Sequence, residues 1–149
     1  MARTTFSGPV KSNNGFEGSI TGNMAGTGVV THATKAAINA TATATAAEVA
    51  TGYITSTSAA ATTITMPTGT LLGAALGASQ GYVHELYIDN TAGASTVTMA
   101  VGTNAILSTA AADTAGSFGD LTVAAGATGL ARYTLMFSSA TAYVITRTA

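Results

Sequence analysis

Charged side chains are scarce in this chain of 149 residues. Asp, Glu, Lys and Arg together make up 7% of it, whereas about a quarter of a typical soluble domain is charged. The net charge is −1, and the five basic residues are spread from Arg3 to Arg147. The sequence therefore has neither the basic stripe of a nucleic-acid-binding protein nor an acidic tail. Its surface must be covered by something other than charge.

Cysteine is absent, which excludes disulfides and metal sites built on thiolates. Long apolar runs are missing too. Residues 49–84 carry no Asp, Glu, Lys or Arg, but Thr, Ser, Gly and Pro interrupt every apolar stretch well short of the roughly 18 residues that a membrane span requires. The N-terminus lacks the continuous apolar segment of a secretory signal. We therefore expect neither export by that route nor a membrane partner.

Small residues are abundant where charge is missing. The chain contains about thirty alanines and nearly as many threonines, with Gly and Ser between them, far above average usage. Such a composition is typical of a protein whose surface is covered by copies of itself or by neighbouring molecules. It indicates a structural role in preference to catalysis.

The larger apolar residues are concentrated after Val49. We therefore predict an extended N-terminal arm over residues 1–45 and a folded domain over residues 46–149. The arm carries turn-forming residues every few positions and has little apolar surface of its own, so it would become ordered only along the surface of a partner. Its expected anchors are Phe6, Val10, Phe16 and Ile20.

Two short helices are expected. Thr45-x-x-Glu48 matches a capping box, which predicts one helical turn over 46–50 that stops at Gly52. The segment LLGAALGAS fits a second helix, capped by Thr68 or Thr70 and ended by Gly77, with Leu71, Leu72, Ala75 and Leu76 on one face.

The remaining segments alternate as strands do. We expect strands at 53–57, 62–66, 82–89, 96–101, 105–107 and 121–123, and a final antiparallel hairpin formed by LARYTLMF and TAYVITR. Closely spaced strands without long helices between them indicate an all-β fold, an antiparallel β-sandwich or jelly roll. A parallel α/β architecture is not expected.

The order of several segments resembles a β-domain of tailed-bacteriophage virion proteins. These segments are TAAEVATGYIT, TTITMPTGTLLGAAL, YIDNTAGASTVTMAVGTNAIL and LTVAAGATGLARYTLMFSSATAYVITR, which together cover about residues 45–147. The resemblance implies a virion component, since that family includes capsid decoration proteins, head fibres and modules of tail fibres.

Candidate sites are few. His84 and Glu85 are metal-ligand types, but neighbouring strand residues point to opposite faces, so the two side chains cannot readily share an ion. No nucleophile elbow or other catalytic signature is present, and we predict no enzyme activity and no cofactor. The tyrosines are interpreted as core or subunit-interface residues, with a sugar-binding platform as the alternative. They are Tyr53, Tyr82, Tyr87, Tyr133 and Tyr143.

The function that these observations favour is capsid decoration. The protein would be made in the host cytoplasm, assemble as a homo-oligomer, with a trimer favoured, and bind the outer surface of the phage head. There its arm would bridge subunits of the major capsid protein. The alternative is a receptor-binding module of a head fibre or tail fibre, although the chain has no repeat or coiled-coil shaft that would give it reach.

Overall fold

The structure is a computed structural model that describes residues 35–108 and 121–149. These residues form ten strands, two α-helices and one turn of 3-10 helix. In chain order the elements are β1 (Ala36–Ala37), β2 (Ala42–Thr43), α1 (Ala46–Ala50), β3 (Tyr53–Thr55), β4 (Thr62–Thr65), α2 (Gly69–Leu76), β5 (Val83–Asp89), β6 (Val97–Ala100), β7 (Ala105–Ser108), β8 (Thr122–Val123), η1 (Gly126–Thr128), β9 (Leu130–Ser139) and β10 (Ala142–Arg147).

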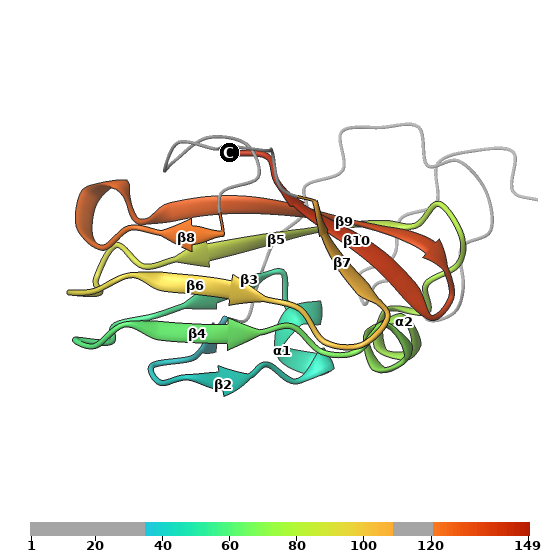
Figure 1. Ribbon diagram of the computed structural model, residues 1–149, viewed down its shortest axis with the longest axis horizontal. Helices are drawn as coiled ribbons and strands as arrows, with labels where there is room; N and C mark the ends of the chain where they lie inside the picture. Colours follow the sequence, from blue (N-terminus) through green and yellow to red (C-terminus); the bar gives the residue numbers. More distant parts are fainter. Residues whose placement is uncertain (1–34, 109–120) are drawn as a thin grey trace, which may run out of the picture. The chain divides into compact units, whose positions relative to one another are not determined.

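The strands form two sheets, seen as two layers in Figure 1. Sheet A has the order β1-β3-β5-β9-β10-β7, and sheet B has the order β2-β4-β6-β8. From β1 to β9 the chain places each successive strand in the other sheet. In sheet B and in the β1-β3-β5 part of sheet A, neighbouring strands are therefore two apart in sequence. The strands of β1-β3-β5 and of β2-β4-β6 run parallel.

The expected antiparallel β-sandwich or jelly roll is wrong. The fold has mixed α/β character, because both sheets combine parallel and antiparallel pairs and two short helices join strands. Parallel strands need a crossover connection of a dozen or more residues, which is usually a helix. Here the crossover is a strand of the opposite sheet: β4 and α2 connect β3 to β5. The absence of long helices was therefore no argument against parallel pairing.

Both sheets include residues that precede position 46. Ala36 and Ala37 of β1 pair with Ile54 and Thr55 of β3. Ala42 and Thr43 of β2 pair with β4, and the Thr63 backbone N–H donates to Thr41 Oγ1 at 3.1 Å. Among the described residues, the layered structure thus begins at β1, ahead of position 46.

The first helix forms as predicted. Thr45 Oγ1 accepts from the Glu48 N–H at 3.2 Å, and Glu48 Oε2 accepts from the Thr45 N–H at 2.7 Å, which completes the capping box of α1. Gly52 follows with a positive φ of 72°, a conformation in which glycine carries no steric penalty.

The second helix is capped by Thr68 and ends at Gly77, as expected. Its buried face differs from the predicted one, because Leu71 is 60% exposed while Gly69, Leu72 and Gly73 are buried. A Cβ atom on Gly73 would collide with the backbone oxygen of Ala140 in the β9–β10 turn. The two glycines allow α2 to approach that turn closely, and this contact selects the face.

The terminal hairpin is confirmed. β9 and β10 pair antiparallel, with Phe137 opposite Tyr143 and Tyr133 opposite Arg147. β9 also pairs antiparallel with β5, so the hairpin continues sheet A on the side of β5 away from β3.

The core consists mainly of inward-facing side chains of the two sheets, together with Val49 of α1 and Leu72 of α2. Its largest members, each less than 2% exposed, are Tyr133, Tyr143, Phe137, Ile54, Ile64, Met66, Leu72, Leu86, Ile88, Met99, Leu135 and Ile145. Asn90, also fully buried, directly follows β5 and connects the layers at one edge. Its Nδ2 donates to the carbonyl oxygens of Ser95 and Ala124, both at 2.9 Å.

Candidate functional site

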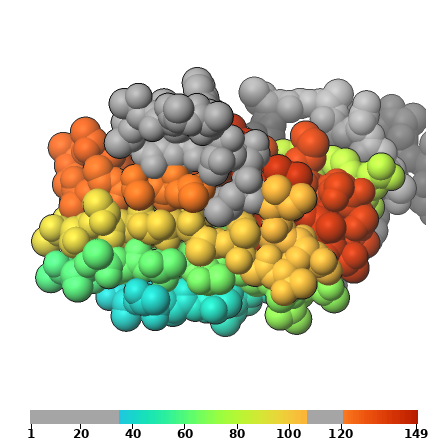
Figure 2. All heavy atoms as spheres, viewed as in Figure 1, coloured from blue at the N-terminus to red at the C-terminus, as the bar shows by residue number. Residues whose placement is uncertain are grey.

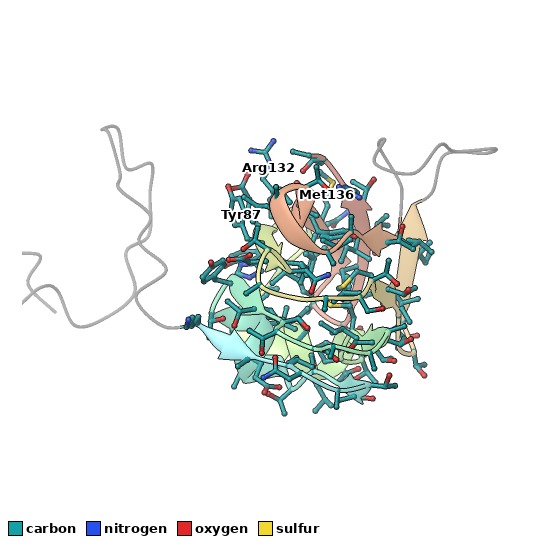
Figure 3. All side chains as sticks on the ribbon, turned by 90° about the vertical axis from the view of Figure 1, so that its left-hand side faces the viewer. Tyr87, Arg132 and Met136 are labelled. Carbon is teal, nitrogen blue, oxygen red and sulfur yellow. The ribbon has the colours of Figure 1, made fainter. Side chains whose placement is uncertain are left out.

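The outer face of sheet A carries the exposed side chains that are suited to binding. Residues on β5 and β9 alternate between the core and this face, as strand geometry requires. The strand register aligns the outward residues of neighbouring strands into rows that cross the sheet. Figure 3 labels Tyr87, Arg132 and Met136, which come from adjacent strands β5 and β9.

One of these rows is apolar, and we call it the apolar row. Val83 of β5 lies opposite Met136 of β9, Met136 lies opposite Val144 of β10, and Val144 lies opposite Ile106 of β7. Val83, Met136 and Ile106 are 48%, 55% and 64% exposed. Four adjacent strands thus present one continuous line of apolar side chains to solvent. Contiguous exposed apolar surface on a folded protein marks an interaction site more often than isolated exposed residues do.

The next outward positions are polar. Glu85 of β5 lies opposite Thr134 of β9, and Thr134 lies opposite Thr146 of β10. Arg132 Nη1 is 4.0 Å from Glu85 Oε1, and Arg132 Nε donates to Thr148 Oγ1 at 3.2 Å. Because this ion pair is solvent-exposed, it contributes little to stability.

A shallow pocket of about 370 Å³ occupies the other end of the face, next to the turn after β5. The register places Tyr53 of β3 beside Tyr87 of β5, and Asp89 opposite Leu130. The pocket is lined by Tyr53, Tyr87, Asp89, Thr91 and Leu130, and we call it the tyrosine pocket.

The Asp89 carboxylate is the chemical centre of this pocket. The Tyr53 hydroxyl donates to Oδ2 at 2.5 Å, while the Thr91 hydroxyl and backbone N–H donate to Oδ1 at 2.6 and 3.0 Å. The hydrogen bond from the Thr91 hydroxyl lowers the pKa of Asp89 the most, followed by that from Tyr53, and the positive charge of Lys35 lowers it further. The hydrogen bond to Asp89 in turn raises the pKa of Tyr53. Asp89 therefore keeps its charge and Tyr53 its proton at neutral pH.

The five candidate tyrosines do not form one surface. Tyr53 and Tyr87 lie together in the tyrosine pocket, and Tyr82 is 36% exposed. Tyr133 and Tyr143 are at most 1% exposed and belong to the core, so an interface role does not apply to them. The Tyr143 hydroxyl donates to the Pro67 carbonyl oxygen at 2.8 Å, and burial raises its pKa. An interface role for the other three stays a prediction.

His84 and Glu85 point to opposite faces of β5, as their adjacency predicted. His84 Nε2 lies 3.0 Å from the Val49 carbonyl oxygen, within hydrogen-bonding distance, and Glu85 faces solvent beside Arg132. Within residues 35–108 and 121–149, no three His, Asp or Glu side chains lie close enough together to hold a metal ion. The expected arm anchors Phe6, Val10, Phe16 and Ile20 lie outside the described residues.

Sequence reasoning missed the apolar row. Alternation along β5 placed Val83, Glu85, Tyr87 and Asp89 on one face, and the structure confirms that grouping. The alignment of Val83 with residues of β9, β10 and β7 depends on strand order. In particular, the parallel pairing of β7 with β10 places Ile106 in the row, and no local pattern in the sequence signals that pairing.

No protein-family model, curated protein or solved structure matches this chain. Neither α-helix in the described part of the chain has the length and apolar character to cross a bilayer; the longer, α2, has 8 residues.

Proposed function

We propose that the protein is a capsid decoration protein, which binds the outer surface of a phage head and stabilises the shell by adhesion. The virion context comes from the resemblance of residues 45–147 to virion β-domains. The observation that carries an adhesive role is the apolar row, which crosses β5, β9, β10 and β7 on the outer face of sheet A.

The apolar row supplies surface that association would remove from water. Burial of apolar area is the main favourable contribution to protein association, and it has no strong dependence on salt. In the proposed assembly, each subunit buries this row against a sister subunit in a homotrimer. The arm, through Phe6, Val10, Phe16 and Ile20, contacts the major capsid protein. Many weak identical contacts then hold the shell through avidity.

The rival function is a receptor-binding module of a fibre, and the tyrosine pocket is the observation that favours it. Exposed aromatic rings beside a carboxylate form a surface on which a host glycan could bind. The pocket involves few residues, whereas the apolar row spans four strands, and we therefore rank decoration first.

Binding measurements with purified protein separate the two functions. The protein is mixed with undecorated heads and, separately, with host cells, and the bound fraction is measured by co-sedimentation. Decoration predicts saturable head binding at a fixed ratio to the major capsid protein. Binding to cells without binding to heads would support the fibre function and refute decoration.

The arm is tested within the full-length chain. Phe16→Ser is expected to weaken head binding, because it removes an aromatic anchor, while the oligomeric state is unchanged. Leu71→Ser, which removes an exposed apolar side chain of the folded domain outside the apolar row and the tyrosine pocket, is the matched control. Equal head binding by wild type and Phe16→Ser would exclude this residue as an anchor.

A further inference from the structure

The tyrosine pocket offers hydrogen-bond acceptors at its Asp89 end. The hydroxyl protons of Tyr53 and Thr91 are both directed at the Asp89 carboxylate, and the Thr91 backbone N–H is used there as well. What these groups still present to a ligand is the lone pairs of their oxygen atoms. A ligand that reaches this end of the pocket must therefore donate hydrogen bonds.

The Asp89 carboxylate also retains its negative charge and some acceptor capacity. An ionised carboxylate has about four lone-pair sites, of which three are filled by Tyr53 and Thr91, so about one remains on Oδ2. All three donors are neutral. Among the described residues no Lys or Arg forms an ion pair with Asp89, since Arg132 pairs with Glu85 and Lys35, which is exposed, acts on Asp89 only through its electric field. The charge is thus available to a cation.

The walls of the pocket are suited to an organic cation. The phenol rings of Tyr53 and Tyr87 come from adjacent positions on paired strands, and Leu130 adds an aliphatic side chain that is 53% exposed. Cations are attracted to the faces of aromatic rings. A guanidinium group is planar, stacks on such faces, and loses its hydration more readily than an ammonium group does.

We propose that the tyrosine pocket binds a basic side chain of a docking protein, with arginine preferred over lysine. The arginine would place its guanidinium group against Tyr53 and Tyr87 and donate one hydrogen bond to Asp89 Oδ2. The volume of about 370 Å³ is at the low end of ligand pockets and fits a single side chain. This inference rests on the proposed function, because it states which chemistry the adhesive partner presents.

A glycan is the other ligand that an aromatic pocket suggests, and the hydrogen-bond pattern disfavours it. Sugar hydroxyls both donate and accept, so a sugar site usually offers donors and acceptors together. At the Asp89 end of this pocket the donors of Tyr53 and Thr91 are already used. The unneutralised charge of Asp89 also adds nothing for a neutral sugar, whereas it attracts a cation directly.

Small probes test the proposal on the full chain. The isotope-labelled protein is titrated with N-acetyl-arginine amide, N-acetyl-lysine amide, N-acetyl-citrulline amide and methyl glucoside, and amide shifts are followed by NMR. Arginine is expected to shift the resonances of Tyr53, Asp89 and Thr91 most strongly. Citrulline, which has nearly the same shape without the charge, is expected to bind about tenfold more weakly because it loses a charge-assisted contact. Equal binding of arginine and citrulline, or binding of the glucoside alone, would overturn the proposal.

Variants assign the binding to the pocket. Asp89→Asn is expected to abolish the preference for arginine over citrulline. Glu85→Gln is the matched control, because it removes a carboxylate from the same face of the same strand outside the pocket, and it should bind like wild type. Tyr87→Leu keeps the carboxylate and removes a ring, so it should reduce the preference for arginine over lysine. If Asp89→Asn does not fold, the Tyr87→Leu result decides, and an unchanged preference would contradict the proposal.

Head binding distinguishes failure of this inference from failure of the proposed function. If the arginine probe binds but the wild-type protein binds no heads, the pocket assignment stands and decoration fails. If the protein binds heads while the probes do not bind, and Asp89→Asn binds heads as wild type does, decoration stands and the pocket assignment fails.

Discussion

The outer faces of the two sheets differ in chemistry although both belong to one layered fold. Sheet A presents the apolar row, an exposed ion pair and the tyrosine pocket. The outward residues of sheet B are small and uncharged; those on its strands are Thr43, Thr63, Thr65, Thr98, Ala100 and Thr122. Figure 2 shows the strands of sheet B as successive bands from cyan β2 to orange β8.

The comparison explains how a chain with little charge presents a wettable surface. Threonine fits a pleated strand because it is β-branched, and its hydroxyl binds water without a charge. The register aligns Thr63, Thr98 and Thr122 across three strands of sheet B. We infer that threonine hydroxyls take the place of charge on sheet B, whereas sheet A carries the exposed large apolar side chains and the ion pair.

The largest effect, a loss of folding stability, is expected from Gly73→Ala, which disturbs the packing of α2 against the β9–β10 turn of sheet A. In an exposed helix this change stabilises by about 0.5–1 kcal/mol, but here the added Cβ would collide with the backbone oxygen of Ala140 in the β9–β10 turn. We expect a loss of about 2–3 kcal/mol, measured by denaturant unfolding. Ala75→Gly, at an exposed position of α2, is the control and should cost about 1 kcal/mol. A stabilised Gly73→Ala protein would refute the close contact.

The next effect concerns assembly and is obtained by making sheet A resemble sheet B. Met136→Thr combined with Ile106→Thr replaces two apolar members of the row. If the protein forms the proposed trimer, the variant should dissociate at about tenfold higher protein concentration than wild type. This corresponds to a loss of about 2.8 kcal/mol of interaction free energy per trimer, because the dissociation constant of a trimer scales with the square of the concentration. Light scattering coupled to size exclusion measures it. Leu71→Thr, which removes an exposed leucine from α2, should leave assembly unchanged; a row variant that assembles as wild type does would remove the row from the interface.

A smaller effect is expected when sheet B is made to resemble sheet A. Thr63→Val combined with Thr98→Val removes two hydroxyls from adjacent strands and keeps the β-branched shape. The fold should be retained and weak self-association should appear at high concentration, because the face loses bound water and gains apolar surface. Thr63→Ser with Thr98→Ser keeps the hydroxyls and is the control. Identical scattering by the valine and serine variants would show that the hydroxyls do not keep this face free of contacts.

The smallest effect is a pH dependence of the unfolding free energy, which arises from Asp89 in the tyrosine pocket. Because the folded-state pKa of Asp89 is lowered, its stabilising contribution is present above the ordinary carboxyl pKa of about 3.9 and is lost as pH falls through the lower folded value. The unfolding free energy of wild type should therefore approach that of Asp89→Asn as pH falls below about 4. Thr91→Val removes the hydrogen bond that lowers the pKa of Asp89 the most. In this background, the difference in unfolding free energy between the proteins without and with Asp89→Asn should depend less on pH. A constant gap between wild type and Asp89→Asn from neutral pH to acid would contradict it.

Local features were predictable from the sequence where neighbouring residues alone determine them. Thr45 and Glu48 are three positions apart and cap α1 by their own hydrogen bonds. The β9–β10 hairpin follows from two alternating segments joined by a short connection. Asn90 shows the limit of such reasoning, because the carbonyl of Ala124 that its amide reaches is 34 residues away. No pattern near position 90 indicates that contact.

By itself, the sequence determined the low charge of the surface, the alternation of each strand and the caps of both helices, because these depend on composition and on residues a few positions apart. Only the tertiary structure decided that the strands alternate between two sheets and that several of them pair in parallel. It also decided that α2 buries its glycines and that Ile106 lies in the same apolar row as Val83. Those outcomes depend on which segments meet across the core, and strands of similar composition can pair in several orders with little difference in local energy.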